Sequence, residues 1–169
     1  MLQDTENPWK DFANEVGGKY RISEDGMSLV TGSYRGLPFV LKMIFIPAAP
    51  KVHIFLTHFE LLIENKRKFK LKIYREGIIQ KLTKLFGTRD IMFNDRSFDK
   101  KYIVEGNNVD DLVKLFPPSI RATLMELGEF LMILDGDKLI YEESGKIIKK
   151  TKLFKVLELL ADLAEKIAQ

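Results

Sequence analysis

The sequence predicts an α+β fold, with a mainly antiparallel sheet of five to seven strands and helices packed on one face of that sheet. Within residues 66–75, basic and apolar residues alternate strictly from Lys68 to Ile73, a pattern typical of a strand with one buried and one solvated face. Two Asp-Gly pairs, Asp25-Gly26 and Asp135-Gly136, lie between apolar runs and favour tight β-hairpins. A broad apolar stripe with helical spacing over residues 151–168 predicts a helix that docks on the sheet.

The first half of the chain is expected to begin with a short helix and to continue as a meander. Asn7 and Pro8 mark the helix start, because asparagine caps helices and proline fits the first helical position. The apolar positions of 51–64 change parity part-way, which predicts a bulge near Thr57-His58. Strands are expected at residues 20–23, 27–34, 37–46, 51–64 and 66–75, followed by a helix over 77–87.

The second half is expected to alternate helices with one more hairpin. Asn108 is placed to cap a helix whose first turn carries Asp110 and Asp111, and Pro117-Pro118 divides the helical region 109–127 in two. The expected elements are a strand over 101–105, helices within 109–127, a hairpin of 130–134 with 138–142, and the final helix.

Composition indicates one globular domain over residues 1–169 with a single core, since 46% of the residues are hydrophobic. The chain has no cysteine, which excludes disulfides, thiolate metal sites and a cysteine nucleophile. The start of the chain is acidic and polar, unlike a signal peptide. Its most apolar window, Leu37–Ala49, is interrupted by Lys42 and is too short for a membrane helix. We therefore expect a cytoplasmic protein without a transmembrane segment.

Few residues carry a catalytic or metal-binding pattern. His53 and His58 are five residues apart in a strand-like segment, so they fall on opposite faces unless a bulge intervenes. The loop Asn94–Asp99 holds two carboxylates and an arginine, which fit a helix cap better than an acid–base site. No glycine-rich loop precedes a helix as a phosphate-binding loop must. The sequence therefore predicts no catalytic residue, no metal site and no cofactor.

Charge is concentrated in one segment. Residues 65–84 contain eight basic residues and one acidic residue, a local charge of +7 in a chain of net charge +3. The predicted anion- or partner-binding residues are Lys68, Lys70, Lys72 and Arg75, with an acidic protein, a nucleic acid or an anionic surface as the partner. Phe69, Leu71 and Ile73 are expected to be buried behind an exposed lysine face. The same lysines would equally serve to keep a sheet surface soluble.

Short turn and aromatic patterns spread over most of the chain resemble those of a loosely defined group of uncharacterised prokaryotic α+β domains. They comprise Trp9, Phe12-Ala13, Gly17-Gly18 and Tyr20; Gly32–Gly36; and Leu85–Gly87, Asp90-Ile91, Asp95, Phe98-Asp99, Tyr102, Val104 and Gly106-Asn107. The resemblance implies a bacterial or archaeal domain and transfers no activity or site residue.

These observations favour a non-catalytic binding or interaction module with a basic sheet face. The alternative is an enzyme or small-ligand-binding protein whose site is assembled from residues distant in sequence. A deep polar pocket would favour the alternative, and a flat basic face would favour the module. The sequence leaves the oligomeric state open.

Overall fold

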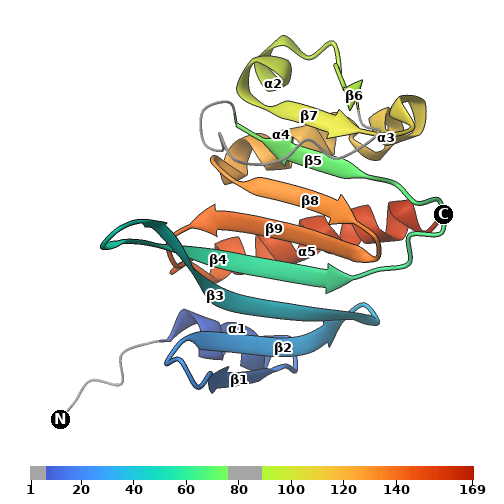
Figure 1. Cartoon of the computed structure of the whole chain (residues 1–169). Helices are drawn as coiled ribbons and strands as arrows, with labels where there is room; N and C mark the ends of the chain where they lie inside the picture. The colour runs from blue at the N-terminus through green and yellow to red at the C-terminus, as the bar shows by residue number, and fades with distance from the viewer. Residues whose placement is uncertain (1–6, 76–88) are drawn as a thin grey trace.

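A computed structural model describes residues 7–75 and 89–169 of the chain (Figure 1). The expected helix over 77–87 and the polar start of the chain lie outside these residues. In chain order the elements are α1 (Pro8–Glu15), β1 (Lys19–Ile22), β2 (Ser28–Tyr34), β3 (Leu37–Ala49), β4 (Val52–Leu62), β5 (Leu71–Tyr74), β6 (Arg89–Asp90), α2 (Arg96–Lys101), β7 (Ile103–Gly106), α3 (Val109–Leu115), α4 (Pro118–Leu127), β8 (Leu131–Asp135), β9 (Lys138–Ser144) and α5 (Lys150–Ile167).

The strands of the described residues form one open sheet of nine strands, in the order β1-β2-β3-β4-β9-β8-β5-β7-β6. Every pair of neighbouring strands is antiparallel, as expected. The expected count of five to seven strands is wrong; among the strands of the described residues, the two-residue edge strand β6 was not expected. The hairpin β8–β9 lies between β4 and β5, so β5 does not pair with the strand that precedes it in the chain.

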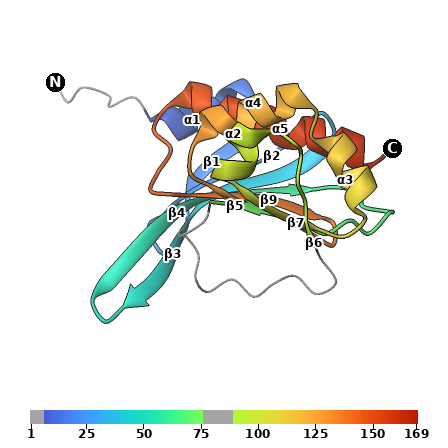
Figure 2. The ribbon, with the colours of Figure 1, turned by 90° about the horizontal axis from the view of Figure 1, so that it is seen from above.

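The helices of the described residues lie on one face of the sheet, and no described helix covers the other face, which we call the open face (Figure 2). On the covered face, Phe12 of α1 packs edge-on against Phe39 and Phe59 of the sheet and against Phe154 of α5, with ring centroids 5.0–6.1 Å apart. Trp9 is fully buried, and its indole N–H donates to the carbonyl oxygen of Ile147, 2.8 Å away. These contacts fix α1 and the start of α5 over the same strands.

Several local sequence signals are confirmed. The Asn7 side chain accepts hydrogen bonds from the backbone N–H groups of the first turn of α1. Asp95 caps α2 by accepting from the backbone N–H of Phe98, which confirms the interpretation of the 94–99 loop as a cap. Gly26 and Gly136 have φ angles of 80° and 56°, as tight hairpins require.

Two local predictions are wrong. Asn108 precedes α3, but its side chain donates to Asp111 instead of capping the helix backbone. The strand β4 has no bulge at Thr57-His58; the irregularity in its pairing with β3 lies between Pro47 and Ala49. The change of parity among the apolar residues of 51–64 therefore has another cause. The outer half of β4 extends past its neighbouring strands and carries apolar residues on the open side of the sheet.

No helix in residues 7–75 and 89–169 is both long enough and apolar enough to span a membrane.

The buried half of the alternating segment is confirmed, because Phe69, Leu71 and Ile73 are all buried. Leu71 of β5, an interior strand of the sheet, pairs with Leu134 and Gly106 and is fully buried. Leu71→Ala should lower the free energy of unfolding by about 2–5 kcal/mol in urea denaturation, since it leaves a cavity between three strands. Leu62→Ala, at a leucine that is 49% exposed on β4, is the control and should cost much less. Equal effects of the two substitutions would contradict the assigned face.

Burial keeps two tyrosines, Tyr102 and Tyr141, protonated as neutral phenols. Burial raises the pKa of Tyr102 to about 12, and its hydroxyl lies 2.8 Å from the carbonyl oxygen of Leu124. Burial, followed by the nearby Glu143 carboxylate, also raises the pKa of Tyr141. A pKa raised in the folded state stabilises the fold below the unfolded pKa, near 10, and this contribution is lost as pH rises through the folded pKa.

An alkaline titration followed by phenolate absorbance should therefore show Tyr102 and Tyr141 still protonated at about pH 11, where an unfolded tyrosine is ionised. Their absorbance should appear only together with the loss of circular dichroism. Ionisation of all the tyrosines while the protein stays folded would contradict the burial of these two rings. Tyr102→Phe and Tyr141→Phe variants assign the late-titrating signal.

Candidate functional site

The basic segment 66–75 is divided between a turn and a strand. Only Leu71–Tyr74 forms β5, whereas residues 66–67 form a turn and Lys68 adopts a left-handed backbone with φ of 52°. The alternation of basic and apolar residues therefore does not correspond to one long strand. The lysines of the segment consequently do not share one sheet face.

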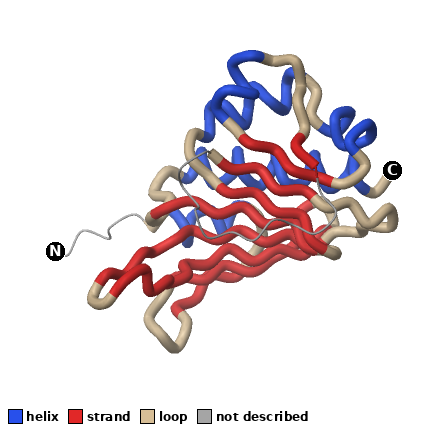
Figure 3. The backbone as a smooth tube through the Cα atoms, turned by 45° about the horizontal axis from the view of Figure 1, so that its top comes forward, coloured by secondary structure: helices blue, strands red, loops and turns tan. Residues whose placement is uncertain are grey.

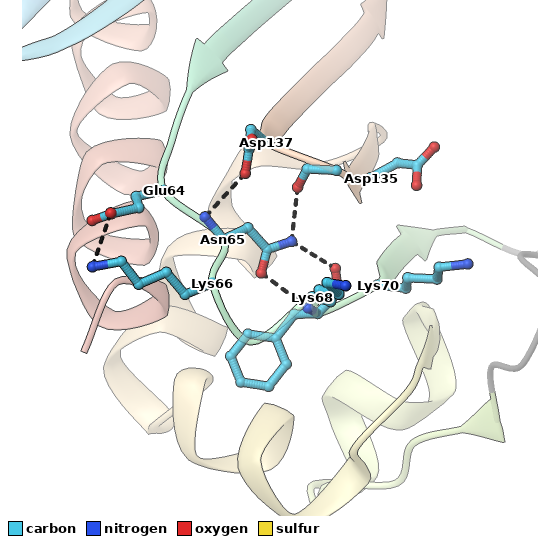
Figure 4. A pocket seen from close by; sticks show the side chains of 9 residues that line it. Glu64, Asn65, Lys66, Lys68, Lys70, Asp135 and Asp137 are labelled. Carbon is cyan, nitrogen blue, oxygen red and sulfur yellow. Dashed lines mark hydrogen bonds and ion pairs between the residues drawn. The ribbon is translucent and has the colours of Figure 1, made fainter.

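Asn65 organises the turn. Its side-chain amide donates to the carbonyl oxygens of Phe69 (2.9 Å) and Gly136 (2.7 Å), and its side-chain oxygen accepts from the Phe69 N–H (2.9 Å). The Asn65 N–H also donates to the Asp137 carboxylate (Figure 4). A single buried asparagine thus joins the turn to the β8–β9 hairpin.

A shallow hollow of about 560 Å³ lies beside this turn. It brings Lys68 and Lys70 together, and neither ammonium group has an ion-pair partner among the described residues (Figure 4). Acidic and basic side chains are equally numerous in the hollow, so it is polar without being basic overall. Its lining residues are Glu64, Asn65, Lys66, Lys68, Phe69, Lys70, Asp135, Gly136 and Asp137.

The other two predicted site residues lie elsewhere. Lys72 is only 3% exposed, so the prediction of a lysine face that includes it is wrong. Because β5 lies between β7 and β8, Lys72 is flanked in register by Glu105 and Ile133, and its ammonium group lies 4.9 Å from the ring centroid of Tyr74. Arg75 forms an ion pair with Glu129. The predicted four-residue surface therefore reduces to Lys68 and Lys70.

A polar cluster on the open face was not predicted from the sequence. His58 lies with Nδ1 2.6 Å from a Glu142 oxygen and Nε2 3.4 Å from a Glu60 oxygen, and Lys138 pairs with Glu60 at 3.0 Å. Burial is the largest influence on Glu60 and raises its pKa, but the hydrogen bonds and charges of Lys138 and His58 together bring the pKa below its ordinary value. Both ring nitrogens of His58 are thus engaged by carboxylates, an arrangement that fastens β4 to β9.

Among the described residues, five of the nine exposed large apolar side chains lie in the outer half of the β3–β4 hairpin, residues 43–57, which we call the outer ribbon. The neighbouring strand β2 pairs with β3 only as far as Lys42, and β9 pairs with β4 only from Thr57 onward. Beyond these points the ribbon projects from the sheet as two strands (Figure 2 and Figure 3). The large apolar side chains exposed there by 40–51% are Phe45, Ile46, Val52, Ile54 and Phe55.

The comparison with solved structures identifies the fold. The crystal structure of the mycobacterial trehalose monomycolate transport factor A, TtfA, superposes with a TM-score of 0.64 and covers 95% of this chain and 92% of its own. The chain has the fold of TtfA. The two sequences are 13% identical, so the likeness to TtfA extends to the fold alone. No family model and no curated protein matches the sequence.

The three hydrogen bonds of the Asn65 side chain predict a sensitive position. Asn65→Ala should lower the free energy of unfolding by about 2–4 kcal/mol, because it leaves buried polar groups of Phe69 and Gly136 without partners. Urea denaturation measures the loss, with Asn14→Ala on the exposed side of α1 as the control. The role assigned to Asn65 is contradicted if both variants unfold at the same urea concentration.

Proposed function

We propose that this protein is a non-catalytic interaction module that contacts its partner through the outer ribbon. The observation that carries the proposal is the exposure of five large apolar side chains on a projecting two-stranded element. Burying a side chain of this size is worth about 1.5–3 kcal/mol, so their combined exposure is a substantial unused driving force for association.

The ribbon is apolar on both sides. Cross-strand pairing places Phe45 opposite Phe55 and Ile46 opposite Ile54, and these neighbouring pairs point to opposite faces. The Phe45 and Phe55 rings pack edge-on with centroids 5.6 Å apart, and the His53 ring lies 4.5 Å from that of Phe45, yet both phenylalanines stay more than 40% exposed. If the ribbon served only to connect β3 to β4, polar residues at these positions would keep it soluble.

The alternative of an enzyme or small-ligand protein has weaker support. The open-face cluster is a site assembled from distant residues, as that alternative requires, but both nitrogens of His58 are occupied by Glu60 and Glu142. The hollow beside Lys68 and Lys70 is shallow. A module is also in keeping with the name of TtfA, a transport factor, since such a role needs binding surfaces.

Lys68 and Lys70 remain a proposed anion contact of the same module. Their ammonium groups lie without ion-pair partners within the described structure, whereas Arg67 and Arg75 are paired with Asp111 and Glu129. An acidic protein, a nucleic acid or an anionic surface would each satisfy these two lysines.

Site-specific photo-crosslinking in the native cells tests the proposal. A photoreactive phenylalanine at Phe55 should give adducts, whereas the same group at Leu62 should not. Leu62 lies on the same strand with a similar exposed fraction, 49% against 46%, but it sits within the sheet and not on the ribbon. Adducts that are absent at Phe55, or equally abundant at both positions, would overturn the proposal.

A further inference from the structure

The charge of the outer ribbon restricts what its partner can be. No aspartate or glutamate occurs between Asp25 and Glu60, whereas Lys42 and Lys51 both lie in this interval. Lys51 is exposed at the tip of the ribbon, and its ammonium group has no ion-pair partner in the part of the chain that the structure describes. The ribbon therefore combines apolar side chains with positive charge.

The connection between β9 and α5, which begins at the base of the ribbon, also combines an exposed apolar residue with a lysine. The N–H of Gly145 donates to the carbonyl oxygen of Phe55 at 2.7 Å, which places the β9–α5 connection beside the ribbon. Ile148 in this connection is 70% exposed, and the adjacent Lys149 is exposed without an ion-pair partner among the described residues.

Acidic residues near this base are already engaged. Glu143 accepts an ion pair from Lys152 at 2.8 Å, and Glu15 is paired with Lys150. Their charges are balanced within the fold, whereas Lys51 at the tip of the ribbon and Lys149 in the β9–α5 connection carry positive charge without an ion-pair partner among the described residues.

On these grounds we infer that the partner of the outer ribbon is the surface of an anionic lipid bilayer. This inference rests on the proposed function and specifies its partner. Apolar and aromatic side chains flanked by lysines are the combination that binds the boundary between headgroups and acyl chains. Lipids can contact the apolar side chains on both faces of the ribbon, whereas a protein groove would cover only one face.

The backbone sets the depth of insertion. Beyond Lys42 and Thr57 no strand of the described residues pairs with the outer edges of the ribbon. Apart from the Phe55 carbonyl, which accepts from the Gly145 N–H, the outward N–H and C=O groups of these edges therefore need water or headgroups. Lys51 at the tip needs the same surroundings. The ribbon therefore lies at headgroup depth and does not cross the hydrocarbon core.

Strand addition by a second copy fits the ribbon less well. Pro47 within β3 and Pro50 after it have no N–H to donate, and Lys51 follows directly. Proline and lysine are the residues that natural sheet edges use to prevent pairing with another chain. An exposed apolar ribbon protected in this way is suited to lipid contact.

Vesicle co-sedimentation of the full chain tests the inference. The protein should bind vesicles of equal parts phosphatidylglycerol and phosphatidylcholine, and it should bind pure phosphatidylcholine at least about tenfold more weakly. Phe45→Ser with Phe55→Ser should weaken binding about tenfold or more. Lys51→Gln and Lys149→Gln should each weaken it about fivefold. All four side chains are exposed or at the tip, so circular dichroism should show unchanged folding.

Matched controls separate the ribbon from the rest of the surface. Met92→Ser, at a methionine that is 65% exposed away from the ribbon, and Lys114→Gln, at an exposed lysine of α3, should leave vesicle binding unchanged. The inference is overturned if the ribbon variants bind like the parent, if both vesicle types bind equally, or if the Met92 or Lys114 variant loses binding. A dimer in sedimentation velocity that the Phe45 and Phe55 substitutions dissolve would assign the ribbon to a second copy.

The two proposals fail differently. Absence of vesicle binding, together with a specific protein adduct at Phe55 in cells, would reject the lipid surface and retain the interaction module. Absence of both would reject the two together.

Discussion

The pairing of β3 with β4 is the interaction on which the rest of the structure depends. These strands are longer than their neighbours, and one register runs from Phe39 opposite Leu61 in the covered part of the sheet to Pro47 opposite His53 in the outer ribbon, shifting only between Pro47 and Ala49. In the inner half it places Phe39 and Phe59 beneath α1, where they form the aromatic contacts that hold α1 and α5 together. In the outer half it continues without neighbours and leaves the large apolar side chains exposed. The core and the proposed contact surface are thus two ends of the same pairing.

Close packing on the covered face tolerates little change at this pairing. Gly32 of β2 lies opposite Phe39, and a Cβ atom at residue 32 would approach the Phe39 ring to 2.9 Å. The glycine therefore lets the β3 aromatic ring lie flat against the neighbouring strand. Any larger residue would displace Phe39 from its contact with Phe12 and disturb the position of α1.

Local signals in the sequence predicted much of the fold, and long-range register accounts for what they missed. Asn7, Asp95 and the two Asp-Gly turns act within a few residues, so their effects were visible in the sequence. Lys72 is 3% exposed, and its neighbours in the sheet, Glu105 and Ile133, come from segments far along the chain, so its surroundings could not be predicted from residues 66–75. Likewise, Arg75 and its partner Glu129 are distant in sequence, so the local charge of +7 overstated the basic surface. In the sequence, the sign of the outer ribbon was a change of parity among the apolar residues of 51–64. The exposure of the ribbon depends on where β2 stops pairing with β3 and where β9 stops pairing with β4.

The position of β8–β9 between β4 and β5 constrains how the chain folds. The edge of β4 pairs only with β9, whose residues come 76–86 positions later in the chain, and β5 pairs with β8, whose residues come 57–63 positions later. Contacts that close such long loops make folding slow compared with that of a simple meander. During synthesis, the N-terminal hairpins would remain with one unpaired strand edge until the last third of the chain emerged. The connection that Asn65 ties to the β8–β9 turn is then among the last parts of the molecule to become ordered.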